Sequence, residues 1–170
     1  GPSQNLDFIV QIASMINDLP EVCFLLLGEG SEKKRLQNIV EVNKCQNVVF
    51  KGFLSKDEYQ LLAKEVDIGL VSLSNKNKTP VMPGKILGFM AASLPTVAFM
   101  HKESDGHKLI KEAHCGYSMV PDSQDNAAKL IEKIYYERSD LKKLGNNGYR
   151  YALQHFSKEV CIGKIEQLIQ

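Results

Sequence analysis

The stretch that decides the fold is Glu21-Val-Cys-Phe-Leu-Leu-Leu27, which runs directly into Gly28-Glu-Gly30. Every residue of the run after Glu21 is apolar, so its hydrophobicity is continuous rather than alternating. A run of this length and pattern indicates a strand that is covered on both faces, which is typical of a parallel sheet. The glycines that follow it indicate a turn towards the next element.

Further apolar runs of strand length follow, and segments with helical periodicity separate them. Strands that alternate with helices predict a parallel sheet with helices on both faces, joined by right-handed crossovers in a Rossmann-like α/β fold. We expect a single domain over residues 4–170. The expected strands are 21–27, 47–50, 67–73, 94–99 and 116–120, and the expected helices are 5–18, 31–43, 55–64, 83–92, 106–113, 123 to about 134, 140–155 and 157–169.

Composition and charge exclude several classes of protein. The chain has 170 residues and a formal net charge of +1, so it lacks the basic footprint of a nucleic-acid-binding domain. No apolar run reaches the roughly 18 residues of a transmembrane helix, and Gly1-Pro2-Ser3 resembles the scar left when an expression tag is cleaved off. Cys23, Cys45, Cys115 and Cys161 form no CxxC pair, which favours reduced cysteines packed as small hydrophobes and a cytoplasmic location.

Ligands bind a doubly wound sheet outside the carboxyl ends of its strands, so the loops after the strands form the candidate site. The sharpest of these loops leads into Pro83-Gly84-Lys85 at the start of an expected helix. The amides of Gly84, Lys85 and Ile86 would have no partner inside that helix, and with its dipole they would attract an anion. The alternative is an ordinary helix N-terminus with a solvated Lys, which the local chemistry alone favours.

The other candidates at this edge carry weaker signals. Gly28-Glu-Gly30 lacks the third glycine of a dinucleotide-binding fingerprint and can equally be a tight strand-to-helix turn. His101, His107, His114 and Cys115 lie close together in the sequence, but their spacing matches no metal-site signature. We therefore expect no metal ion, and the absence of an Asp-x-Asp motif agrees with that expectation.

Several motifs occur together and in order over almost the whole chain. Gly28-Glu-Gly30 is followed by Asn47-Val-Val-Phe-Lys-Gly52 and then by a strand that contains Val66-Asp67-Ile68. Residues 83–97 are similar to the pattern P-x-K-x-x-E-Y-M-A-x-x-x-P-V, and residues 141–157 to a pair of closing helices before a Phe-Ser step. In these features the chain resembles the retaining, family 4 (group 1) glycosyltransferases of the GT-B fold, in particular those that assemble bacterial capsules and surface polysaccharides.

The resemblance implies that the chain is the C-terminal, nucleotide-sugar-binding domain of such an enzyme. The parent protein would transfer a hexose from a UDP- or GDP-sugar to a glycan or lipid-linked acceptor, in the cytoplasm or at the inner face of the membrane. The N-terminal acceptor domain would be absent from this chain, which would therefore be inactive alone. No cofactor or metal is implied, because backbone dipoles and a lysine would neutralise the diphosphate. The implied site residues are Gly28 and Gly30, then Gly52, Phe53 and Leu54 facing the base, and Pro83, Gly84, Lys85 and Ile86 around the diphosphate.

Two positions depart from the family pattern. Gly88 stands where the family has a Glu that binds the ribose hydroxyls, and Pro80 stands where many members have another Glu. The loss of such charge-assisted hydrogen bonds leaves a second interpretation open, a degenerate and non-catalytic scaffold domain. A third, a sugar-nucleotide epimerase of the same architecture, fits residues 83–97 less well. Family members also carry a strand and a glycine-rich loop ahead of a segment like Gln4-Asn-Leu-Asp7, and we expect this chain to begin after both.

Overall fold

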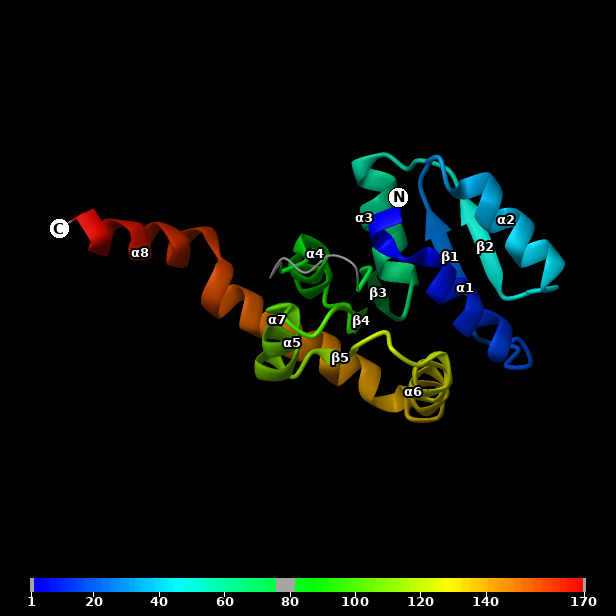
Figure 1. Cartoon of the computed structure of the whole chain (residues 1–170). Helices are drawn as coiled ribbons and strands as arrows, with labels where there is room; N and C mark the ends of the chain where they lie inside the picture. Colours follow the sequence, from blue (N-terminus) through cyan, green and yellow to red (C-terminus); the bar gives the residue numbers. More distant parts are fainter. Residues whose placement is uncertain (1, 76–81, 170) are drawn as a thin grey trace.

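The structure is a computed structural model that describes residues 2–75 and 82–169. Strands and helices alternate along the chain, as the sequence predicts (Figure 1). The strands are β1 (Phe24–Leu27), β2 (Val48–Lys51), β3 (Gly69–Ser72), β4 (Thr96–Phe99) and β5 (Gly116–Met119). The helices are α1 (Leu6–Met15), α2 (Lys33–Val42), α3 (Lys56–Glu65), α4 (Gly84–Ala91), α5 (Gly106–Ala113), α6 (Gln124–Tyr136), α7 (Leu141–Phe156) and α8 (Lys158–Ile169), with the 3-10 turns η1 (Pro2–Gln4) and η2 (Arg138–Asp140).

All strand pairs in the described residues are parallel, which confirms the predicted α/β class. The strands nevertheless form two separate sheets: β1 pairs with β2, and β3, β4 and β5 pair in that order. Figure 1 shows the β1–β2 pair beside α1 and α2, with the second sheet nearer the centre of the molecule. In the described part of the chain no strand pairing joins β1 to β3.

Helices cover both faces of the three-stranded sheet, and side chains alternate between those faces along β4. Val97 and Phe99 pack in a buried cluster with α1 and α6, and the rings of Phe8 and Phe99 meet edge to face with centroids 5.4 Å apart. Ala98 and Met100 pack in a second cluster with α4 and α5. Because both faces are buried, the sequence of this strand is apolar throughout rather than alternating.

α7 packs so closely on the rest of the domain that two of its positions have room only for glycine. A Cβ atom on Gly145 would lie 2.0 Å from the backbone oxygen of Ser93, and one on Gly148 would lie 2.9 Å from the Cβ atom of Cys115. The helix can therefore lie directly against backbone, which is the close packing expected of a protein interior. Beyond it, α8 projects away from the domain (Figure 1).

The cysteines follow the sequence-based expectation only in part. All four are free, and Cys45 and Cys115 are buried, where burial raises the pKa of the Cys115 thiol to about 11. Cys23 and Cys161 are exposed, so the expectation that they pack as small hydrophobes is wrong. Cys23 precedes β1 instead of lying within it, and Cys161 lies on the projecting helix α8. Among the described residues, no helix combines the length and apolar character needed to cross a membrane.

Candidate functional site

The carboxyl ends of β1 and β2 bring the first two predicted loops into contact. The amide of Gly28 donates a hydrogen bond to the carbonyl oxygen of Lys51 at 3.1 Å, and Gly28 has φ = 117°, a conformation that favours glycine. The Glu29 carboxylate lies beside Gly52, because its Oε1 atom is 3.1 Å from where a Cβ on that glycine would stand. The two loops thus form one continuous surface at this edge.

Phe53 is the most conspicuous side chain on that surface. The residue is 83% exposed, although an aromatic residue of this size is normally at least partly covered. Leu54 beside it is partly buried, and Gly30 on the neighbouring loop is exposed and accepts a hydrogen bond from the Lys33 amide at 3.2 Å. An exposed aromatic ring can stack against a planar ring of a ligand, and the neighbouring glycines leave the backbone beside it accessible.

The start of α4 offers a second group of polar atoms, at the carboxyl end of β3. Pro83 is the N-cap of the helix and is buried, and its carbonyl oxygen accepts a hydrogen bond from the Ile86 amide at 3.0 Å. The Ile86 amide is therefore already paired, and its side chain is fully buried. No described residue accepts a hydrogen bond from the Gly84 or Lys85 amide. These two exposed amides are the part of the predicted anion site that is open to a ligand.

Lys85 is the cation at this helix start. Its Nζ atom donates a hydrogen bond to the neutral Oε1 atom of Gln4 at 3.3 Å, and desolvation by its neighbours lowers its pKa. No described carboxylate lies within 4.0 Å of that ammonium, whereas Lys33 and Arg35 are ion-paired with carboxylates. A partly desolvated ammonium without a counter-ion, next to two free amides at the positive end of a helix, can bind an anion.

The two groups of predicted residues lie on different parts of the fold. The glycine loops and Phe53 belong to the β1–β2 sheet, and Pro83 to Ile86 belong to the second sheet. Within residues 2–75 and 82–169, no hydrogen bond links the first group to the second. Gly88 lies one turn further along α4, is exposed, and would have no atom within 4 Å of an added Cβ. Pro80, with most of the expected loop 74–82, lies outside the described residues.

Sequence reasoning missed one feature of this edge, and it considered a second, His101, only as a possible metal ligand. The contact between Gln4 and Lys85 joins residues far apart in the chain, and no local motif signals it. His101, at the end of β4, is only 3% exposed, and its Nδ1 atom lies 3.4 Å from Oε2 of Glu103. Its Nε2 atom has no hydrogen-bond partner among the residues that the structure describes. In the part of the chain that the structure describes, no group of three His, Cys, Asp or Glu residues is placed to hold a metal ion.

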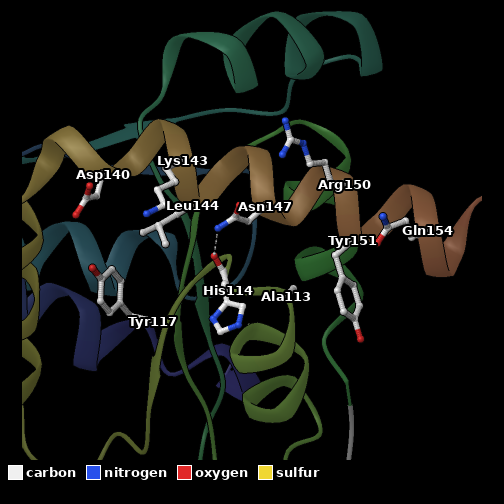
Figure 2. Close-up of a pocket in the computed structure, with 10 residues that line it drawn as sticks. All are labelled: Ala113, His114, Tyr117, Asp140, Lys143, Leu144, Asn147, Arg150, Tyr151 and Gln154. Atoms are coloured by element: carbon white, nitrogen blue, oxygen red, sulfur yellow. Dashed lines mark hydrogen bonds between the residues drawn. The ribbon is translucent and has the colours of Figure 1, made fainter.

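A groove of about 600 Å³ lies away from this edge, between α7 and the turn that leads into β5 (Figure 2). The Asn147 side chain crosses it and donates a hydrogen bond to the His114 carbonyl oxygen at 3.1 Å. The sequence did not single out this groove, which lies at the amino end of β5. It is lined by Ala113, His114, Tyr117, Asp140, Lys143, Leu144, Asn147, Arg150, Tyr151 and Gln154.

Known proteins share both the sequence pattern and the fold of this chain. Residues 2–136 match the family described as "Glycosyl transferases group 1". The Pseudomonas aeruginosa protein named "Probable glycosyltransferase WbjE" is 22% identical over 170 residues, which are 100% of this chain and 42% of that relative. The chain thus spans less than half the length of this curated relative.

Two solved structures show the same fold at low sequence identity. Anabaena Alr3699/HepE, crystallised in complex with UDP-glucose, has a TM-score of 0.79 and 19% identity over 99% of this chain and 46% of its own. The C-terminal domain of the group 1 glycosyl transferase LpcC from Francisella tularensis has a TM-score of 0.76 and 17% identity over 93% of this chain and 82% of its own. With the family match over most of the chain, these likenesses show that the chain belongs to the group 1 glycosyltransferases and has the fold of their C-terminal domain.

Proposed function

We propose that this domain binds the nucleotide diphosphate part of a sugar donor, in a parent protein that transfers a hexose from a UDP- or GDP-sugar with retention of configuration. The observation that carries the proposal is Lys85, whose ammonium is partly desolvated and lacks a described counter-ion at the start of α4. A diphosphate supplies the missing negative charge. Its oxygens can accept hydrogen bonds from the Gly84 and Lys85 amides as well as from the ammonium.

The nucleoside would lie across the other loops of the same edge. Phe53 offers an exposed ring for stacking on the base. The backbone amides and carbonyl groups of Gly52 and Leu54 can form hydrogen bonds with the edge of that base. Gly28 and Gly30 let the ligand approach the backbone beside them. HepE, solved with UDP-glucose, supports a uridine nucleotide as the first candidate. The proposal needs no metal ion, because the helix dipole and Lys85 neutralise the phosphate charge.

The parent protein would supply the acceptor site. We place the acceptor, a glycan or lipid-linked sugar in surface polysaccharide assembly, on an N-terminal domain outside this chain, with the reaction at the cytoplasmic face of the membrane. Sugar transfer requires the two reactants to be aligned in a cleft from which water is excluded. The 170-residue chain by itself would therefore bind the donor without transferring its sugar.

One observation favours a second function, a scaffold that no longer binds the donor. Gly88 leaves the exposed face of α4 without the carboxylate that the family uses for the ribose hydroxyls, and the space beside it is open. The substitution Gly88→Glu can therefore be accommodated and would restore that carboxylate. If wild-type parent protein binds no nucleotide and Gly88→Glu gains binding, the scaffold function is supported and donor binding by the natural protein is refuted.

The test of the donor-binding function is an assay of the parent protein with a panel of UDP- and GDP-sugars, measuring nucleoside diphosphate release. We expect release from one donor, undiminished by a chelator, and no release by the 170-residue chain. The anomeric configuration of the product, read by NMR, tests retention. Loss of release in the chelator would contradict the metal-free part of the proposal, and no release together with no nucleotide binding would contradict the whole of it.

A further inference from the structure

The groove between α7 and the turn into β5 is separate from the edge that carries the proposed nucleotide site. It lies at the amino end of β5, whereas Phe53 and Lys85 follow the carboxyl ends of β2 and β3. Its volume of about 600 Å³ is within the range of clefts that bind small molecules. A ligand in this groove would therefore leave the nucleotide site free.

The two walls of the groove are fixed to each other and to the domain. α7 lies against neighbouring backbone and side chains at Gly145 and Gly148, where a Cβ atom would have no room. The Asn147 side chain ties the same helix to the turn, because it donates a hydrogen bond to the His114 carbonyl oxygen at 3.1 Å. A site whose walls are already in place loses little conformational freedom when a ligand binds.

His114 occupies a backbone position that favours glycine. It is the C-cap of α5 and has φ = 47° and ψ = 41°, in the left-handed region that costs a residue with a side chain free energy. Its imidazole is exposed and, in the part of the chain that the structure describes, donates and accepts no hydrogen bond. A side chain that the fold does not use, at a strained position beside a groove, indicates a role in binding.

The helix that forms one wall is positively charged. α7 carries Lys142, Lys143 and Arg150 and has no Asp or Glu in its sequence. Lys143 and Arg150 line the groove two turns apart, and neither is ion-paired within the described residues. Figure 2 shows Asn147 between them, with Arg150 at the rim and directed away from the turn. Asp140 is the only carboxylate among the lining residues, so the groove has a surplus of positive charge that favours an anionic ligand.

The uncharged lining residues suit a ligand with rings and hydroxyl groups. Asn147 and Gln154 carry amides that both donate and accept hydrogen bonds, and Asn147 uses only one of its donor hydrogens on His114. The ring of Tyr117 lies across the groove from the Asp140 end of α7 (Figure 2). The C–H face of a sugar ring can stack on such an aromatic ring while its hydroxyl groups bond the amides.

The groove is also long. Its lining residues follow α7 from Lys143 to Gln154, which is about 16 Å at the helical rise of about 1.5 Å per residue. An extended ligand fills such a groove better than a compact one does. An acidic peptide is also extended, but peptides bind largely through exposed backbone partners, and the His114 carbonyl oxygen at this turn is already bonded to Asn147.

We propose that this groove binds a segment of an acidic glycan, a chain of sugars that carry carboxylate groups. Lys143 and Arg150 hold the carboxylates, because both are exposed side chains long enough to turn towards them. One sugar ring lies against Tyr117, and the amides of Asn147 and Gln154 bond its hydroxyl groups. Binding at this groove does not require the nucleotide site.

An NMR titration of the 170-residue chain without nucleotide tests the proposal. The probes are a trisaccharide of galacturonic acid, the neutral trisaccharide maltotriose and a short peptide of glutamates. We expect the acidic trisaccharide to shift the signals of His114, Tyr117 and the Asn147 side-chain amide in a saturable manner, and the other two probes to bind at least about tenfold more weakly.

Variants of α7 separate a site from general attraction to a basic surface. Lys143→Gln should weaken binding of the acidic trisaccharide about tenfold, since it removes one charge-assisted contact. Lys142→Gln is the matched control, because it makes the same charge change on the same helix at an exposed residue that does not line the groove. We expect this control to bind as the unchanged chain does.

His114→Gly tests the role of the imidazole separately from folding. Glycine suits the left-handed backbone, so the variant should unfold at an equal or higher denaturant concentration while it binds the acidic trisaccharide more weakly. A less stable variant would mean that this imidazole serves the fold, which removes the argument for a ligand contact.

Three further outcomes would overturn the proposal. Equal binding of maltotriose would mean that the positive charge selects nothing. Tighter binding of the glutamate peptide would assign the groove to an acidic protein segment instead. Equal loss of affinity in Lys143→Gln and Lys142→Gln, or no shift at His114 and Asn147 with the acidic trisaccharide, would mean that the groove is not a glycan site.

Discussion

Replacement of Lys85 by Gln probes the anion site without removing the helix that carries it. The change removes the ammonium charge but keeps a polar side chain of similar length. The backbone amides of residues 84 and 85 stay in place. Within the described residues, the Lys85 side chain donates one hydrogen bond, to Gln4, and the variant loses that bond. The substitution should therefore leave the fold intact and weaken diphosphate binding.

The size of the effect follows from the surroundings of Lys85. A hydrogen bond to a charged group contributes about 1.5–3 kcal/mol, and this residue is exposed, so the lower end applies. A loss of about 1.4 kcal/mol corresponds to a tenfold rise in Kd. We expect roughly tenfold weaker UDP or GDP binding, with residual affinity from the two amides. Because desolvation lowers the Lys85 pKa below its ordinary 10.5, wild-type affinity should fall as the pH rises towards that value, and the variant should lack this fall.

Isothermal titration calorimetry of the longer parent protein measures these affinities. Lys129→Gln is the matched control, because it makes the same charge change on α6, where Lys129 is exposed and has no described ion pair. We expect the control to bind as wild type does. Equal Kd values for wild type and Lys85→Gln, with unchanged pH profiles, would refute the argument that this ammonium holds the diphosphate.

Two further predictions concern stability. In a denaturant titration, Gly145→Ala should destabilise the domain by about 1–3 kcal/mol through overpacking, since its Cβ would meet the Ser93 oxygen at 2.0 Å. The control Gly163→Ala, which adds its Cβ in open space on α8, should be neutral or stabilising. The Arg35 guanidinium holds the pKa of Asp7 below its ordinary 3.8, so this ion pair stabilises the fold above that pH, and its contribution is lost as the pH falls through the lowered pKa. Asp7→Asn should therefore make the free energy of unfolding fall less steeply with decreasing pH in the acid range. An unchanged dependence on pH would contradict the assignment.

The elements and their order could be predicted from hydrophobic pattern and capping chemistry. Ser55-Lys-Asp-Glu58 matches the sequence pattern of a capping box, and the structure has both of its reciprocal hydrogen bonds at the start of α3. The apolar run at β4 is buried on both faces, as continuous hydrophobicity predicts. Strand ends were less predictable: β1 begins at Phe24 rather than Glu21. Local pattern marks where apolar residues lie, whereas tertiary pairing decides which of them join the ladder.

The split of the sheet and the partners of the candidate site could not be predicted, because both depend on long-range contacts. Nothing near Lys85 in the sequence indicates that Gln4 is its partner, and helical geometry alone did not reveal that the Ile86 amide is paired with Pro83. The exposure of Phe53 likewise could not be predicted locally, because an aromatic residue is ordinarily expected to be at least partly covered. Sequence motifs placed the loops at one edge, but the geometry decides which atoms there are open to a ligand.

The central claim is that a nucleoside diphosphate binds at the start of α4 and beside Phe53. Its most direct test is an amide NMR titration of the parent protein, and of this domain up to millimolar ligand, with UDP, GDP, ADP and dTDP. The account requires one nucleotide to shift the Gly84, Lys85 and Phe53 signals together, in a saturable manner. Two results would contradict it. One is that only residues of the groove beside α7, such as His114 and Asn147, shift. The other is that the Gly84 and Lys85 signals stay unchanged in the parent protein at saturating nucleotide.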